Sequence, residues 1–159
     1  HHHEALAAIM APTTNSYARL RPASLSGYWA NWGIDHRAVT VRVSTETGQA
    51  ARIEHRLADC AASPYFGLAA MLQAGLLGLE HGYALPEAET SDSMGRAGTD
   101  RHTPNSLGDA LDALEADLAL RSALGTELVD NFLCIKREEL RELEDKSSDE
   151  QIAYYLHYI

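Results

Sequence analysis

A short run of alternating charged residues is the part of this chain most suited to chemistry. The run is Arg52-Ile53-Glu54-His55-Arg56. Side chains alternate across a β-strand, so the two arginines and Glu54 would share one face. Arginine binds carboxylates and phosphates through paired hydrogen bonds, and a carboxylate is a ligand for hard divalent cations. The run therefore favours an anion site with a metal-binding carboxylate, although a salt-bridged solvent face would give the same pattern.

Two strands joined by a turn are expected around this run. Apolar and polar residues alternate over 38–44, residues 45–49 contain a glycine, and a second strand is expected over 50–57. Strands joined by so short a turn pair as an antiparallel hairpin.

The hairpin predicts which side chains gather on each face. If it is centred on Thr47, Arg42 lies opposite Arg52 and Thr40 lies opposite Glu54. The other face would then carry the apolar side chains Val39, Val41, Val43 and Ile53.

Composition limits the class of protein. The 159 residues are 45% hydrophobic and 23% charged, which is typical of one globular domain. The net charge of −10 argues against nucleic acid as a partner, and no apolar stretch is long enough to predict a membrane span. Residues 1–60 differ from the rest, because they carry a net charge of +1 with arginine as the only basic residue type. Two cysteines and no signal-like N-terminus favour a cytoplasmic protein.

Helices are predicted for most of the remaining chain. Their expected ranges are 1–10, 63–81, 106–125, 127–146 and 149–158. Ser63, Ser106 and Thr126 stand where helix N-caps are expected, and Gly82 stands where the second helix would end. Residues 13–37 are expected to form a long loop and residues 83–105 an exposed excursion.

Several motifs resemble those of the glutamine synthetase family. The segment Pro12-Thr13-Thr14-Asn15-Ser16-Tyr17-Ala18-Arg19-Leu20-Arg21-Pro22 resembles the family's signature Asn-Ser-Tyr-Lys-Arg-Leu-x-Pro. His36-Arg37, Val41-Arg42-Val43, the Arg52–Arg56 run, the segment 59–70 and the tail from Ser106 through Lys136 to Tyr155 follow in the family's order. The similarity spans essentially the whole chain.

The resemblance implies a role for each matching residue. Arg19 and Arg56 would hold the carboxylates of glutamate, Arg37 would neutralise the transferred phosphoryl group, Arg42 and Arg52 would contact ATP, and Glu54 would bind Mg²⁺ or Mn²⁺. The implied reaction uses ATP to form γ-glutamyl phosphate, which an amine then attacks.

The resemblance also implies a fold and an assembly. The expected fold is α+β, with antiparallel strands of a glutamine-synthetase-like catalytic barrel followed by a helical C-terminal region. Residues 1–159 would be the C-terminal portion of that catalytic domain and inactive alone, because the family's other metal ligands and its nucleotide motifs lie upstream of the matching segment. Family members form homo-oligomeric rings with active sites between subunits, so a ring is expected.

One departure from the family concerns the amine. Ammonia-using members have a glutamate at the position of Leu25. Leu25, together with Tyr28 and Trp29, would instead form an apolar pocket suited to an organic amine. The resulting hypothesis is a glutamate–amine ligase. The alternatives are a glutamine synthetase that uses ammonia and a non-catalytic relative with a structural or regulatory role, against which the retained arginines and Glu54 argue.

Overall fold

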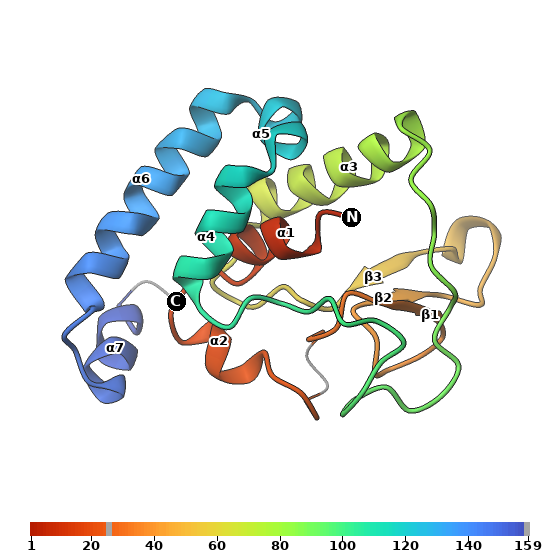
Figure 1. Ribbon diagram of the computed structural model, residues 1–159, viewed down its shortest axis with the longest axis horizontal. Coiled ribbons are helices and arrows are strands. Elements are labelled where there is room, and N and C mark those ends of the chain that lie inside the picture. Colours follow the sequence, from red (N-terminus) through yellow and green to blue (C-terminus); the bar gives the residue numbers. More distant parts are fainter. Residues whose placement is uncertain (25–26, 158–159) are drawn as a thin grey trace.

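A computed structural model describes residues 1–24 and 27–157 and shows a helical body beside a small sheet (Figure 1). The helices are α1 (His3–Met10), α2 (Ser16–Arg19), α3 (Pro64–Glu80), α4 (Leu107–Ala116), α5 (Leu118–Leu124), α6 (Thr126–Leu143) and α7 (Ser148–Tyr155). The strands are β1 (Trp32–Ile34), β2 (Val41–Val43) and β3 (Ile53–His55), and a 3₁₀ turn, η1 (Gly48–Ala50), lies between the last two. The chain is therefore mixed α and β, as expected.

Helix α1 lies at the centre of the helical body, between α3 and α4 (Figure 1). All of its residues except Glu4 are buried. A helix that is apolar on every side must be covered on every side, which explains its central place. Close packing against α3 depends on Gly67, where an added Cβ would lie 3.3 Å from the sulfur of Met10.

The helix starts follow the predicted capping residues in two cases. The Ser63 hydroxyl accepts a hydrogen bond from the Phe66 amide, and the Ser106 hydroxyl accepts one from the Asp109 amide. The expected cap at Thr126 is wrong. Helix α6 begins at Thr126 itself, after Gly125 with φ +96°, and no side chain caps it.

The helix expected over 106–125 is two helices. Asp117 ends α4 and starts α5, because its carboxylate accepts a hydrogen bond from the Leu120 amide 3.0 Å away. The same carboxylate bonds to Nδ1 of His2 at 2.6 Å. An aspartate that offers the backbone a competing hydrogen bond favours a helix start over a helix interior.

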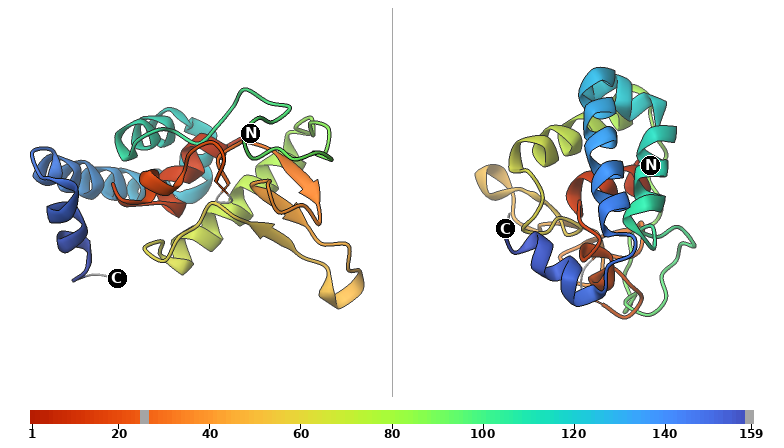
Figure 2. Two further views of the ribbon diagram at one scale, coloured as in Figure 1. Left: turned by 90° about the horizontal axis from the view of Figure 1, so that it is seen from below. Right: turned by 90° about the vertical axis from the view of Figure 1, so that its left-hand side faces the viewer.

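The sheet is mixed, not purely antiparallel as expected. Strand β1 lies within residues 13–37, which were expected to be loop and which also contain α2. It pairs in parallel with β2, and β2 pairs antiparallel with β3. The strands are shorter than predicted and the β2–β3 hairpin extends away from the helices (Figure 2). A three-residue strand containing Gly33 shows no alternation that sequence could reveal.

The register of the hairpin differs from the prediction by two residues. Arg42 lies opposite Glu54, not Arg52, and Val43 lies opposite Ile53. The difference arises because η1 lengthens the connection and delays the start of β3. A shift of two residues keeps every side chain on its predicted face, since the strand period is two. The opposite face is not uniformly covered, because Ile53 is 64% exposed.

The segment 83–105 covers the loop and strand that precede β2. Its backbone bonds to this region at Thr103, whose amide donates to the Tyr28 carbonyl at 2.7 Å, and at Glu89, whose amide donates to the Trp32 carbonyl at 2.8 Å. The excursion is therefore attached along its length, although most of its residues are exposed. Among the described helices, none has the length and apolarity needed to cross a membrane.

Candidate active site

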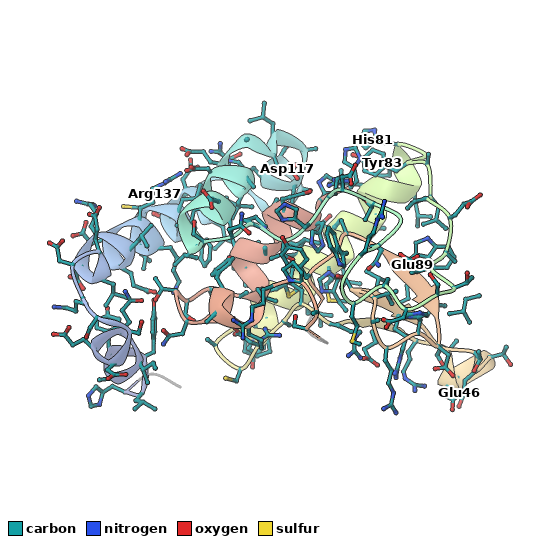
Figure 3. The ribbon with its side chains drawn as sticks, turned by 60° about the horizontal axis from the view of Figure 1, so that its bottom comes forward. Glu46, His81, Tyr83, Glu89, Asp117 and Arg137 are labelled. Atoms are coloured by element: carbon teal, nitrogen blue, oxygen red, sulfur yellow. The ribbon has the colours of Figure 1, made fainter. Side chains whose placement is uncertain are left out.

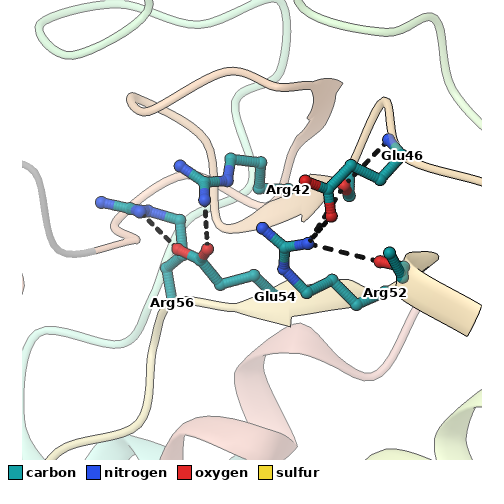
Figure 4. Close-up of polar contacts among 7 residues, drawn as sticks. Arg42, Glu46, Arg52, Glu54 and Arg56 are labelled. Atoms are coloured by element: carbon teal, nitrogen blue, oxygen red, sulfur yellow. Dashed lines mark hydrogen bonds and ion pairs between the residues drawn. The ribbon is translucent and has the colours of Figure 1, made fainter.

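Glu54 stands between two arginines on one face of the hairpin (Figure 4). One carboxylate oxygen lies 2.7 Å from Nη2 of Arg42, and the other lies 2.6 Å from Nη1 of Arg56. The Glu54 side chain is 36% exposed and each arginine side chain is 19% exposed. The cluster is thus partly withdrawn from water yet open to a ligand, and its net charge is positive.

The strand pairing positions all three side chains. Arg42 is the cross-strand partner of Glu54, and Arg56 follows Glu54 by two residues, so the three side chains project from one face. The amide of Arg56 donates to the Thr40 carbonyl at 2.8 Å, which continues the pairing beyond the last β3 residue. The prediction that Arg42, Glu54 and Arg56 share a face is confirmed.

Arg52 projects from the same side of β3 but forms a separate group near η1 (Figure 4). Its guanidinium lies 2.6 Å from a carboxylate oxygen of Glu46 and 3.4 Å from the Ser44 hydroxyl. Both side chains of the ion pair are more than half exposed, and Glu46 lies at the far end of the hairpin (Figure 3). The expected direct pairing of Arg42 with Arg52 does not occur, because of the two-residue difference in register.

Arg19 lies against the chain that leaves β3. Its Nη2 donates to the carbonyl of Leu57 at 3.2 Å and lies 3.8 Å from a carboxylate oxygen of Asp59. Leu57 directly follows Arg56, so the two arginines predicted to hold glutamate converge on one short stretch of backbone. Sequence reasoning missed Asp59 as the partner of Arg19, because this contact joins segments 40 residues apart.

Arg37 is exposed in the connection between β1 and β2. The structure gives it no ion pair with any residue of the described ranges 1–24 and 27–157. An exposed arginine with no ion pair among the described residues contributes little to stability, and its guanidinium is available to a ligand.

The described residues supply only part of a metal site. Both oxygens of Glu54 face arginines, and no group of three or more His, Cys, Asp or Glu side chains in the described part of the chain could hold a metal ion. A divalent cation needs about six oxygen ligands, some of them water. Glu54 fits as a single ligand, and the rest of a centre would have to come from outside these residues.

The aromatic residues assigned to the amine pocket are engaged in packing. The Tyr28 ring stacks on His102 with centroids 4.9 Å apart, and it meets the edge of Trp29 at 4.8 Å. The Trp29 Nε1 atom donates to the Met94 carbonyl at 3.2 Å. Tyr28 is buried and Trp29 is half-buried. Leu25, the residue on which the amine hypothesis depends, lies outside the described residues.

A buried polar group lies behind the hairpin. Nε2 of His3 bonds to the Thr103 hydroxyl at 2.9 Å, and that hydroxyl donates to the Gly27 carbonyl at 3.0 Å. Burial lowers the pKa of His3 to about 4 and also lowers the pKa of His55 to about 4. Both rings are therefore neutral near pH 7, and they serve the packing beneath the site.

Comparison with known proteins identifies the family. The glutamine synthetase catalytic-domain family matches residues 1–155. The chain belongs to this family. Glutamine synthetase from Pyrococcus abyssi is 42% identical over 144 residues, and γ-glutamylpolyamine synthetase from Streptomyces coelicolor is 34% identical over 164 residues. The solved structure of apo GmaS superposes with a TM-score of 0.80 at 33% identity and covers 98% of this chain.

The chain is much shorter than its glutamine synthetase relatives. It covers 33% of the Pyrococcus abyssi enzyme, 35% of the Streptomyces coelicolor enzyme and 35% of the GmaS chain. The chain thus spans about a third of the length of the relatives it matches, with a glutamine-synthetase-like fold over that third.

Proposed function

We propose that this chain is the C-terminal part of the catalytic domain of an ATP-dependent ligase that joins the γ-carboxyl group of L-glutamate to an organic amine. The observation that carries the proposal is the Arg42–Glu54–Arg56 cluster on an open face of a glutamine-synthetase-type catalytic domain. Two arginines around one carboxylate form a positive site that suits anionic substrates.

The arginines have distinct roles in the proposed reaction. The γ-carboxylate of glutamate attacks the γ-phosphorus of ATP, which forms γ-glutamyl phosphate and releases ADP. Arg19 and Arg56 would hold the glutamate carboxylates, and Arg42 and Arg52 would hold the ATP phosphates. Arg37 would offset the charge that develops on the transferred phosphoryl group. The amine then attacks the acyl carbon, phosphate leaves, and the amine loses a proton.

ATP and Mg²⁺ (or Mn²⁺) are the proposed cofactors. Glu54 would contribute one oxygen ligand to a cation that neutralises phosphate charge. The remaining ligands belong to the upstream part of the proposed domain. Family resemblance supports a homo-oligomeric ring in the cytoplasm, with L-glutamate and the amine as small-molecule partners.

An organic amine is favoured over ammonia by Leu25. A leucine cannot make the charge-assisted contact that a carboxylate gives to ammonium, which is worth about 1.5–3 kcal/mol. Relatives that are named for amine ligation, the γ-glutamylpolyamine synthetase and GmaS, support the same reading. The second candidate is glutamine synthetase itself, because many of the similar enzymes carry that name. If the organic-amine proposal holds, Leu25→Glu should improve the use of ammonium, because it supplies the missing carboxylate.

An exposed apolar stripe on α3 supports the proposal that these residues are part of a larger domain. Tyr65, Leu68, Leu72, Leu76 and Leu79 follow one another at helical spacing and are between 48% and 88% exposed. The opposite face of α3 is buried against α1 and α5. A helix that is apolar on both faces is typical of a domain interior.

Paired variants of two glutamates, one on the hairpin and one on α6, test the proposed site. Glu54→Gln, in the complete ligase that contains this chain, should reduce glutamate-dependent phosphate release from ATP by about 100-fold, since a charged group at the reacting phosphates is lost. Glu138→Gln weakens an exposed ion pair with Arg141 on α6 and should change the rate by less than about threefold. Equal effects of the two variants would contradict the assignment.

A further inference from the structure

Helix α7 bonds directly to the segment that leads into α2. The Thr14 amide donates to the Tyr155 hydroxyl at 3.3 Å, and the Thr14 hydroxyl donates to Oε1 of Gln151 at 2.8 Å. These contacts join residues more than 130 positions apart, and they bring α7 beside α2 (Figure 1). One residue of the α2 segment is therefore held by two side chains of the last helix.

Tyr155 and Gln151 are themselves fixed from α6. The Tyr155 hydroxyl donates to Oε1 of Glu139 at 2.6 Å, and the other oxygen of Glu139 lies 2.8 Å from Nζ of Lys136. The Nε2 atom of Gln151 donates to the Leu143 carbonyl at 3.2 Å, at the end of α6. Burial, together with the hydrogen bond to Glu139, raises the pKa of Tyr155, so its hydroxyl stays a donor at neutral pH.

The α2 segment has little structure of its own to hold it. Helix α2 has only four residues, and the side chain of Asn15 at its N-cap position accepts no backbone hydrogen bond. A hydroxyl pair, Thr13 with Ser16 at 2.8 Å, bridges its first turn. Its last residue is Arg19. So short a helix is marginal by itself, and its position depends on contacts from outside.

A cavity of about 340 Å³ lies beside these contacts. Thr13, Cys60 and Ala61 line it from the α2 and Asp59 sides, and Lys136, Glu139, Tyr154 and Tyr155 line it from α6 and α7. Thr13, directly before Thr14, thus borders this space. Tyr17 anchors the other side of α2, because its ring is buried and its hydroxyl donates to the Ala7 carbonyl at 3.3 Å. The hydrogen bonds to Thr14 are the contacts that keep the start of the segment from moving away from α7.

We infer that Tyr155 and Gln151 are positioning residues that hold Arg19 in place for glutamate through Thr14. The inference rests on the proposed function of Arg19. A guanidinium that binds a carboxylate through paired hydrogen bonds needs its backbone fixed to within a fraction of an ångström. Loss of the α7 contacts should therefore weaken glutamate binding while the ATP-binding residues on β2 and β3 remain in place.

Tyr155→Phe in the complete ligase tests this inference, with Tyr65→Phe as the matched control. Tyr155→Phe removes a hydroxyl that bonds to both Thr14 and Glu139, whereas Tyr65→Phe removes a hydroxyl on α3 that makes no hydrogen bond with the described residues. Tyr155→Phe should raise the KM for glutamate about tenfold with a change of less than threefold in the KM for ATP. Tyr65→Phe should change neither constant.

Variants of Thr14 test the same link from the other end. Thr14→Val removes the hydroxyl that donates to Gln151 and should raise the KM for glutamate by several-fold. Thr14→Ser keeps a hydroxyl at this position and should keep the KM for glutamate near that of the unchanged protein. A fall in kcat, or an equal rise in the KM values of both substrates, would show general damage to the fold and would overturn the inference.

Hydrogen exchange separates this inference from the proposed function. In the complete ligase, Tyr155→Phe should speed amide exchange at least tenfold over residues 14–19 and leave β2 and β3 unchanged. Unchanged exchange over residues 14–19 would overturn the positioning role. Faster exchange in a ligase that proves inactive with every amine would leave the positioning of Arg19 intact and refute only the proposed reaction.

Discussion

Substitution of Arg37 should affect activity strongly and stability very little. Its side chain is exposed and forms no ion pair within the described ranges. Arg37→Ala should change the free energy of unfolding by less than about 0.5 kcal/mol. The same change should lower phosphate release in the complete ligase by about 100-fold or more, because a transition-state charge loses its partner.

Arg137 on α6 provides the matched arginine control. Its guanidinium contacts Asp112 at 2.7 Å and Glu115 at 2.6 Å, far from the hairpin in sequence. Arg137→Ala should leave activity within about twofold, since exposed ion pairs contribute little. Chemical denaturation measures the free energy of unfolding of each variant, and phosphate release measures its activity. If Arg37→Ala kept full activity, its proposed role would be wrong.

His3 and His55 give the protein a defined response to acid. The pKa of each ring is lowered to about 4 by burial, against about 6.5 in an unfolded chain. Below pH 6.5 the unfolded state binds protons that the folded state does not. The free energy of unfolding should therefore fall as the pH drops from 6.5 to 4, by about 1.4 kcal/mol per pH unit for each histidine at the steepest point.

A variant of His55 tests whether the buried histidines cause this pH dependence of stability. Nδ1 of His55 is buried and makes no hydrogen bond with the described residues, so His55→Phe suits its surroundings. The variant should lose about half of the pH dependence measured by urea denaturation between pH 7 and pH 5. His81→Phe changes an exposed histidine and should keep the full dependence. An unaltered slope in His55→Phe would exclude the ring as the cause.

The face of the candidate site could be predicted from sequence, but its contacts could not. Strand alternation places Arg42, Glu54 and Arg56 on one face, and a register shift by an even number of residues does not change this. The particular pairing depended on η1, whose 3₁₀ turn has no distinct pattern in the sequence. The contact of Arg19 with Asp59 joins segments far apart in the chain, and local patterns carry no information about such contacts.

Among the elements, the junction of α4 and α5 depends on one side chain. Asp117 accepts a hydrogen bond from the Leu120 amide and also bonds to His2, at the N-cap position of the buried helix α1. It lies where these elements meet (Figure 3). Asp117→Ala should reduce the free energy of unfolding by about 1–3 kcal/mol, since a cap and the partner of a buried ring are both lost.

Asp112→Ala is the control for Asp117→Ala. Asp112 lies on α4 but is 69% exposed, and among the described residues its carboxylate forms an ion pair with Arg137 alone. Its removal should cost less than about 0.5 kcal/mol. Thermal unfolding of the two variants decides the matter, and equal losses of stability would contradict the role given to Asp117.

Elements with clear end signals could be predicted, and those without them could not. Ser63 and Gly82 mark the start and end of α3, which spans Pro64–Glu80 as the sequence predicts. Strand β1 and helix α2 have three and four residues, too few for a period to appear. Strand β1 is held by its pairing with β2 and by the Glu89 amide, and the α2 segment is held by α7, and local sequence patterns show none of these contacts.

At the scale of the whole molecule, the α3 stripe tests whether this chain is part of a larger domain. In a background of Cys60→Ser and Cys134→Ser, Leu72→Cys should react with a thiol reagent at the rate of a free thiol in the 159-residue chain. In the complete ligase the same cysteine should react at least tenfold more slowly. Glu138→Cys, on the polar face of α6, calibrates the rate in both proteins. Equal rates for Leu72→Cys would contradict the proposal.

The most direct test of the whole account is phosphate release from ATP by the complete ligase with L-glutamate and a panel of ammonium, isopropylamine and aniline. We expect release that requires glutamate and an organic amine, with ammonium a poor substrate. Strong activity with ammonium would contradict the role of Leu25 and identify a glutamine synthetase. No release with any amine would contradict the ligase proposal itself and leave a non-catalytic member of the family.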